Sequence, residues 1–333
     1  MIQGHQTWVF DSKPVITASS AVGGPFEAKG ALADDFDMLH EDIWLGQDSY
    51  EKAEKKFLEE ACEIAIRKAG KKKEDVQFFL SGDLMNQIIS SSFTARTLGA
   101  PYIGLFGACS SAMEGLSVAA LIVDSKFGDN VVAATSSHNA AAEKQFRYPT
   151  EYGGQKPPTA QWTVTGAGAA LLTQQGEGPR VTSATIGRVI DMGLSDPFNM
   201  GGAMAPAAVD TIEAHFRDLN RDPSYYDIIA TGDLGRVGHH IATDLLTKHG
   251  IKIPNEKFTD CGILIYKKEQ PVMAGGSGCG CSATVTYGHF LNRMKKGELK
   301  KILIVATGAL MSPLSYQQKE SIPCIAHAVA IEM

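Results

Sequence analysis

The sequence predicts an α/β protein, and three observations support this. Strand-like and helix-like segments alternate along the chain, which is the pattern of a sheet covered by helices. The 333 residues are 44% hydrophobic and 20% charged, which fits a globular chain with a large core and excludes disordered and fibrous classes. One strand, turn and helix pattern also occurs twice in the same order, so we expect two similar halves.

Charge and composition narrow the function classes further. The net charge of -6 excludes the basic surface that nucleic-acid binding needs. We expect no secretory signal, because no basic segment precedes an apolar one at the N-terminus, and no run reaches the ~20 apolar residues of a membrane span. Six cysteines in so long a chain do not predict a disulfide framework, and Cys279 and Cys281 lie too close together for a common zinc site. We therefore expect reduced thiols and no structural metal.

The clearest helix is predicted over residues 49–69. Apolar residues at helical spacing line one of its faces. Asp48 and Glu51 form the predicted capping pair at its start, and Gly70 ends it. A basic turn and a strand over 76–80 follow, as the alternating pattern requires.

The most informative segment is Gly104–Gly115, which places Cys109 on a turn of small residues between an extended run and an apolar helical run. The unpaired amides and the positive dipole end of the following helix favour a thiolate or a bound anion. Three interpretations stay open. Cys109 attacks an acyl thioester, or the amides around Ser110 hold a carboxylate, or the cysteine is a small residue of the core.

The repeated pattern links the two halves of the chain. In each half a helix, a polar turn and a strand lead to a glycine and an aspartate, which is Asp83 in the first half and Asp233 in the second. A small-residue turn then precedes a helical stretch and an apolar strand in both halves. We expect the halves to cover residues 1–178 and 179–333, and a helix to cover residues 209–219 in the second.

Four segments carry a family resemblance. Glu60–Val76 looks like a helix, turn and strand of the thiolase and ketoacyl-synthase superfamily, and Cys109 occupies the place of its nucleophile. Thr165–Leu171 is similar to that superfamily's Gly-Asp-Gly-Ala strand, and Pro323–Ala328 resembles its C-terminal cysteine motif. The resemblance implies a thiolase-like, five-layered αβαβα fold with two pseudo-symmetric halves, commonly assembled as a homodimer.

The chain departs from that superfamily at its two catalytic histidines. Gly232 stands about where the condensing enzymes have the histidine of Pro-His-Gln-Ala-Asn, and Ser277 stands where the other histidine belongs. Removal of one preorganised oxyanion donor costs on the order of 10² to 10³-fold in rate. We therefore expect a degenerate member without condensing activity.

Other histidines of the chain could take the place of the two missing catalytic histidines. His138 follows a strand end, where α/β sites collect, and His327 lies in the C-terminal cysteine motif, so both are candidates for the site. His239 and His240 are weaker candidates, because neighbouring residues on a helix point in different directions.

A narrower resemblance concerns the start of the chain. The segments Lys13–Ile16 and Ser19–Gly23, with the retained cysteine and the missing histidines, are similar to a family of non-catalytic sporulation proteins of spore-forming bacteria. That resemblance implies binding of dipicolinic acid (pyridine-2,6-dicarboxylate), as such or as its calcium chelate, and its uptake into the developing spore. The implied partners are membrane proteins of the same sporulation operon. The implied location is soluble, or peripheral at the spore inner membrane, and no cofactor is implied.

Dipicolinate is a flat dianion that needs amide and hydroxyl donors and an apolar slot for its ring. We expect Asp83 either to accompany calcium or to cap backbone amides. The predicted ligand-binding residues are Asp83, Cys109, Ser110, Ser136, Ser137, His138, Gly232, Asp233, Ser277 and His327. An active acyltransferase that uses Cys109 and a structural subunit with a vestigial pocket are the alternatives.

Overall fold

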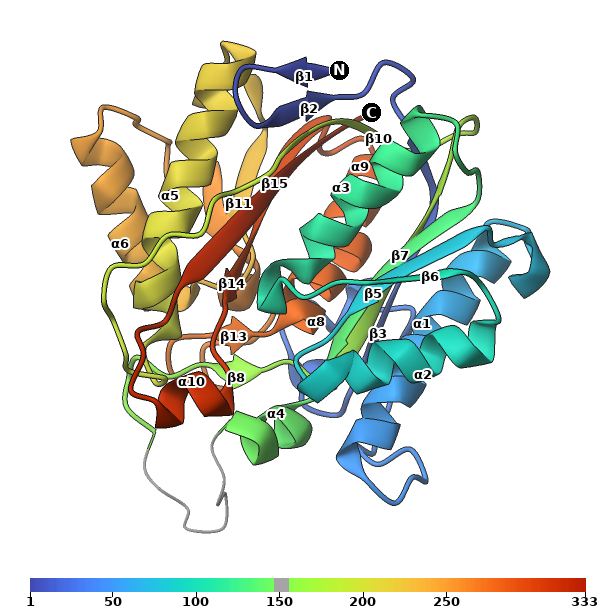
Figure 1. Cartoon of the computed structure of the whole chain (residues 1–333), viewed down its shortest axis with the longest axis horizontal. Coiled ribbons are helices and arrows are strands. Elements are labelled where there is room, and N and C mark those ends of the chain that lie inside the picture. The colour runs from blue at the N-terminus through green and yellow to red at the C-terminus, as the bar shows by residue number, and fades with distance from the viewer. Residues whose placement is uncertain (147–155) are drawn as a thin grey trace.

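The computed structural model describes residues 1–146 and 156–333 and confirms the predicted α/β class (Figure 1). Its strands are β1 (Ile2–Gln3), β2 (Thr7–Val9), β3 (Val15–Gly23), β4 (Met38–Leu39), β5 (Phe78–Gly82), β6 (Tyr102–Gly104), β7 (Val131–Ser137), β8 (Trp162–Thr163), β9 (Gly166–Thr173), β10 (Arg180–Thr185), β11 (Ile228–Thr231), β12 (Phe258–Asp260), β13 (Gly276–Ser277), β14 (Lys301–Ala309) and β15 (Cys324–Glu332). Its α-helices are α1 (Tyr50–Lys68), α2 (Ile89–Leu98), α3 (Ser111–Asp124), α4 (Asn139–Phe146), α5 (Met200–Leu219), α6 (Gly235–Lys248), α7 (Cys261–Leu264), α8 (Cys279–Thr284), α9 (Leu291–Lys295) and α10 (Pro313–Gln317).

The strands pair in an order that repeats between the two parts of the chain. That order is β12-β11-β14-β15-β10-β3-β9-β7-β5-β6. On one side β5 is parallel to β6 and β7, and β9 is antiparallel to β3 and β7. On the other side β11 is parallel to β12 and β14, and β15 is antiparallel to β10 and β14. Halves divided at residue 178 remain our proposal, and this repetition supports it.

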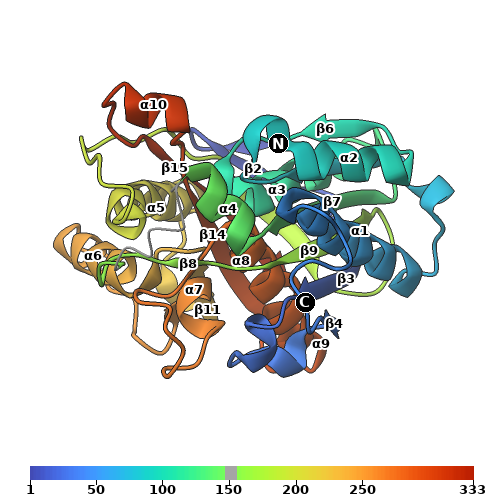
Figure 2. The same ribbon diagram turned by 90° about the horizontal axis from the view of Figure 1, so that it is seen from below.

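Helices lie on both outer faces of the sheet strands and between them (Figures 1 and 2). Helices α1 and α2 cover one outer face, and α5 and α6 cover the other. Helix α3 contacts β5 and β7 on one side and β14 and β15 on the other, so it lies in the central layer with α8. Leu116, Ala119 and Ala120 of α3 have no exposed surface, as expected for the faces of a helix that pack against strands on both sides. The five predicted layers are confirmed.

Two helix boundaries differ from the prediction. Helix α1 begins after Ser49, whose hydroxyl oxygen accepts a hydrogen bond from the amide of Lys52, so the predicted pair of Asp48 and Glu51 is wrong. Asp48 instead forms an exposed ion pair with Lys52. Helix α5 begins at Met200, nine residues before the predicted start, because a buried alanine-rich face precedes its apolar residues.

The cysteines form no disulfide in the structure, in agreement with the predicted reduced thiols. All six cysteines are free and buried. Across residues 1–146 and 156–333, no helix has both the length and the apolar character needed to cross a membrane.

Candidate ligand-binding site

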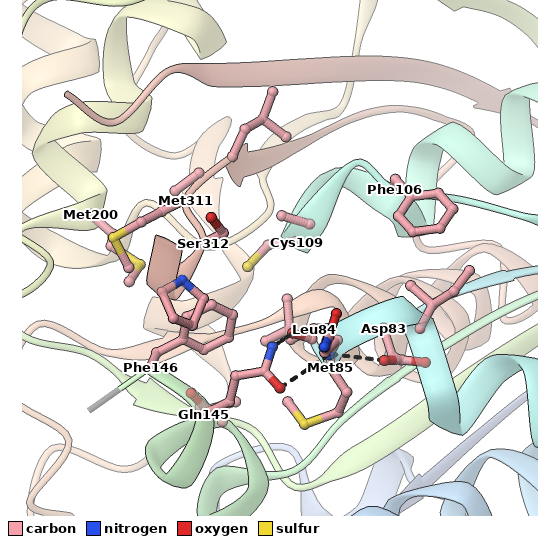
Figure 3. A pocket seen from close by; sticks show the side chains of 18 of the residues that line it. Asp83, Leu84, Met85, Phe106, Cys109, Gln145, Phe146, Met200, Met311 and Ser312 are labelled. Atoms are coloured by element: carbon pink, nitrogen blue, oxygen red, sulfur yellow. Dashed lines mark hydrogen bonds between the residues drawn. The ribbon is translucent and has the colours of Figure 1, made fainter. Parts of the chain in front are cut away.

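A cavity of about 850 Å³ opens where four parts of the chain meet (Figure 3). These parts are the segment 83–88 after β5, the turn that carries Cys109, helix α4, and the segment 309–314, which includes the last residue of β14; Thr163, Met200 and Ser277 complete the lining. Most of the walls are apolar, and Met200 and Met311 lie near one another on one side of the cavity. A site of this volume, with a few polar groups on apolar walls, is typical of small-molecule binding.

Cys109 lies on a one-turn 3-10 helix, Ala108–Ser110, directly before α3, as the sequence predicts. Ala108 has a φ of 50°, which alanine rarely adopts. Strand β14 packs closely against this turn, because a Cβ atom at Gly308 would lie 2.2 Å from the carbonyl oxygen of Gly107. The turn therefore presents Cys109 at the cavity wall while leaving it only 6% exposed.

The carboxylate of Asp233 lies behind the Cys109 thiol and is fully buried. The hydroxyl of Thr307 donates to its Oδ1 at 2.8 Å, and the amide of Gly278 donates to its Oδ2 at 2.9 Å. The hydroxyl of Ser277 donates to Oδ2 at 3.2 Å. The structure thus places two of the predicted residues, Asp233 and Ser277, in contact, and the groups around Asp233 satisfy one another rather than a ligand.

Burial and the charge of Asp233 raise the pKa of the Cys109 thiol well above its usual value. A nucleophilic cysteine needs the opposite, because the thiolate is the reactive form and is favoured by a cation or an imidazole. No histidine hydrogen bonds to Cys109 in the part of the chain that the structure describes. Within the described residues, Cys109 therefore lacks the hydrogen-bonded imidazole that would favour its thiolate.

Asp83 lines the cavity and holds the segment that follows it. Its Oδ1 accepts from the amide of Met85 at 2.8 Å, and its Oδ2 accepts from the amide and the hydroxyl of Ser91 at 2.8 Å and 2.7 Å. Between these anchors Gln87 and Ile88 have φ values of 57° and 45°. A positive φ is rare for a β-branched residue such as Ile88. Asp83 therefore caps backbone amides, one of the two roles expected, and fixes a strained wall of the cavity.

Two comparisons with known proteins decide the family. The model of the stage V sporulation protein AD family matches residues 4–332. Stage V sporulation protein AD of Bacillus subtilis (strain 168) is 49% identical over 331 residues, which cover 99% of this chain and 98% of that protein. The chain belongs to the stage V sporulation protein AD family.

Solved structures identify the fold of this family member as thiolase-like, as predicted. A variant of OleA from Xanthomonas campestris matches with a TM-score of 0.64 and 12% identity over 98% of each chain. The 3-oxoacyl-[acyl-carrier-protein] synthase III of Aquifex aeolicus matches with a TM-score of 0.57 and 13% identity, and covers 96% of this chain and 100% of its own. At these identities the likeness shows the fold alone.

Three predicted residues at the end of β7 face away from the cavity in this family member. Ser136 donates to Glu54 at 3.0 Å, and Ser137 donates to the carbonyl oxygen of Val164 at 2.7 Å. His138 donates from Nε2 to the carbonyl oxygen of Ile43 at 2.9 Å, and burial lowers its pKa. Each of these side chains is therefore satisfied by a partner inside the protein, and none of them lines the cavity.

The remaining predicted residues are also placed by packing. Ser110 donates to the carbonyl oxygen of Gly107 at 2.7 Å and so closes the turn around Cys109. Gly232 allows close approach of two strands, because a Cβ atom there would lie 2.9 Å from the Cα of Ala306. His327 accepts from the amide of Gly187 at 3.3 Å, and burial lowers its pKa to about 4. Of the ten predicted ligand-binding residues, three line the cavity in the described part of the chain, namely Asp83, Cys109 and Ser277.

The two weaker histidine candidates lie away from the cavity. The His239 ring packs against Phe258, with centroids 4.4 Å apart. His240 is exposed and lies 3.7 Å from the carboxylate of Asp244.

Several wall residues were missed by the sequence reasoning. Gln145 of α4 accepts from the amide of Asn86 at 3.0 Å and donates to the carbonyl oxygen of Leu84 at 3.2 Å, which ties two walls together (Figure 3). The segment 310–314 follows β14 as Asp83 follows β5. The ends of parallel strands are where α/β sites collect, and this rule could have found that segment.

The described lining of the cavity carries negative charge but no positive charge. Among the described residues that line it, Asp83 is the one charged group, and no lysine, arginine or histidine accompanies it. Across the same described part of the chain, no cluster of three or more histidine, cysteine, aspartate or glutamate residues could hold a metal ion. A metal bound here would therefore have to bring most of its own ligands.

Proposed function

We propose that this sporulation protein binds dipicolinic acid in the Cys109 cavity without catalysis, and so aids its uptake into the developing spore. Membership of the stage V sporulation protein AD family supports the biological setting. The observation that carries the proposal is a thiolase-like cavity whose cysteine is buried, with a raised pKa, and whose described walls are apolar or uncharged apart from Asp83. Such walls suit a flat aromatic acid better than an acyl transfer.

The charge of the cavity favours the calcium chelate over the free dianion. A bare dianion would approach Asp83, with Asp233 behind the wall, and no cation on the described lining residues would compensate. Calcium neutralises both ligand carboxylates, and it prefers the oxygen ligands that dipicolinate and Asp83 offer. We assign Asp83 as the residue nearest the calcium.

Different wall residues suit the pyridine ring of dipicolinate and its two carboxylates. The apolar side chains of Met85, Phe146 and Met311 line the cavity and suit the faces of a pyridine ring. Asn86 and Thr163 also line it, and their side chains supply uncharged donors for the carboxylates. We place the ligand between these two sets of groups, with Cys109 as a small neutral wall.

Calorimetric titration tests the proposal and its calcium component separately. We expect dipicolinate to bind the full-length protein, and to bind more tightly with equimolar calcium than with a chelator present. Calcium alone should give no comparable heat. Absence of binding in both dipicolinate titrations would reject the function, whereas equal affinities would reject only the charge argument.

Ala309→Phe should weaken dipicolinate binding at least tenfold, which is about 1.4 kcal/mol. Ala309 ends β14 and lines the cavity, so a phenyl ring there occupies ligand space. Ala309→Ser keeps the size of the side chain and is the matched control. Equal affinities for the two variants, both folded by circular dichroism, would place the ligand elsewhere.

Acyl transfer by Cys109 is the second candidate, because the fold is shared with a 3-oxoacyl-[acyl-carrier-protein] synthase III and the cysteine lies on a turn directly before a helix. We expect no acyl adduct on Cys109 after incubation with an acyl thioester, as read by peptide mass spectrometry. An adduct that is lost in Cys109→Ser would favour the enzyme.

The proposed partners are the membrane proteins of the same sporulation operon, and a homodimer is the proposed assembly of the chain itself. Phe106 and Leu314 support a contact at the cavity mouth, because both line the cavity and each is 62% exposed. A partner bound there would stand next to the ligand that it receives or delivers.

A further inference from the structure

One enclosed hydroxyl on the cavity wall has no hydrogen-bond partner among residues 1–146 and 156–333. Thr163 of β8 lines the cavity, and its side chain is almost fully enclosed, since the residue is 5% exposed. Its hydroxyl forms no hydrogen bond with any described residue, yet its oxygen keeps some accessible surface. Because the residue is enclosed except where it lines the cavity, that surface opens into the cavity.

The backbone around Thr163 is fixed by the pairing of β8 with β13. The two strands are parallel, and Thr163 lies opposite Ser277. The amides of the residues before and after Thr163 donate to the carbonyl oxygens of Gly275 and Ser277, each at 2.9 Å. The methyl group of Thr163 faces Gly278, because a Cβ atom there would lie 3.2 Å from the threonine Cγ2. The hydroxyl is therefore the group that this paired strand presents to the cavity.

The other buried carboxyl and hydroxyl groups on the described wall already have partners. Both oxygens of Asp83 accept hydrogen bonds, from the amide of Met85 and from the amide and hydroxyl of Ser91. The hydroxyl of Ser277 is bonded to Asp233 at 3.2 Å. An enclosed hydroxyl without a partner is costly, and a ligand oxygen that accepts from it removes that cost. Thr163 can make this bond without adding charge to the wall.

We propose that Thr163 is a specificity-determining residue of the cavity, and that its hydroxyl donates to one carboxylate of the bound ligand. The inference rests on the proposed function, because dipicolinate supplies that carboxylate. In the calcium chelate, one oxygen of each carboxylate binds the metal and the other is left to accept from the protein. Asp83 recognises the calcium and Thr163 recognises a free carboxylate oxygen, so the two residues select different parts of the ligand.

Thr163→Val tests this role, because it replaces the hydroxyl with a methyl group of nearly the same size. In calorimetric titration of the full-length protein with dipicolinate and equimolar calcium, the valine variant should bind about tenfold more weakly or worse, since a charge-assisted hydrogen bond is lost. Thr163→Ser keeps the hydroxyl and is the matched control. Its affinity should stay within about threefold of the wild type, because the bond to the carboxylate is retained.

Urea unfolding without any ligand gives a second reading that does not depend on dipicolinate. Thr163→Val should leave the unfolding midpoint unchanged or raise it, because the hydroxyl has no partner in the described part of the chain and valine suits a strand. A hydroxyl that served the fold would instead be lost with a lower midpoint.

Equal dipicolinate affinities for the wild type and Thr163→Val would overturn the inference and leave the proposed function standing. A lower unfolding midpoint for Thr163→Val would overturn it too, because the hydroxyl would then have a partner within the protein. Weak binding that Thr163→Ser shares would assign the effect to side-chain shape and has the same consequence. Absence of binding to the wild type would reject the proposed function and this inference with it.

Discussion

Replacing Gly308 with alanine is expected to destabilise the protein by about 3 kcal/mol and to abolish ligand binding. The added Cβ atom would lie 2.2 Å from the carbonyl oxygen of Gly107 and 3.0 Å from the amide nitrogen of Ser110. Both are backbone atoms of the turn that carries Cys109, so β14 and the turn must separate to relieve the overlap. Urea unfolding gives the loss of stability, and a dipicolinate titration gives the loss of binding.

Gly297→Ala is the matched control for this variant. Gly297 has a φ of 77°, and a Cβ atom there would meet nothing within 4 Å. Its replacement should cost only about 1 kcal/mol, from backbone conformation alone. Equal unfolding midpoints for the two variants would show that β14 does not pack on the turn as closely as described.

A second large effect is expected at Glu27, which binds the backbone directly before β9. Its Oε1 accepts from the amide of Thr165 at 3.1 Å and from the hydroxyl of Tyr266, whereas its Oε2 is buried without a partner. Burial raises the pKa of Glu27 from 4.5 to about 7. Between these values the folded protein binds a proton that the unfolded chain has released, so ionisation opposes folding as the pH rises.

The wild-type protein should therefore lose about 2 kcal/mol of stability relative to Glu27→Gln between pH 5 and pH 8. The glutamine keeps the shape of the side chain but does not titrate. Burial also raises the pKa of Asp260 to about 7, so the difference between the two proteins isolates the contribution of Glu27. Parallel stability curves over this range would contradict a buried, titrating Glu27.

The sequence predicted the elements whose signals are local. The alternation of strand and helix patterns indicated the α/β class, and the small-residue turn correctly placed Cys109 before a helix. Asp83 and Asp233 were found from their positions after β5 and β11, because a strand end is visible as the end of an apolar run.

The direction of side chains at the end of β7 was not visible in the sequence. Ser136 and His138 stand at a strand end, as site residues do, but contacts with Glu54 and Ile43 turn them inward. These partners lie 82 and 95 residues away along the chain, so no local pattern reveals them. The pairing of Asp233 with Thr307, 74 residues away, is hidden for the same reason.

A crystal structure of the protein with dipicolinate and calcium tests the central claim most directly. The account predicts one planar ligand in the cavity beside Cys109, with the anomalous signal of calcium on the side of Asp83 and no covalent bond to the sulfur. A ligand bound outside this cavity, or an empty cavity at a concentration that saturates binding in solution, would contradict it.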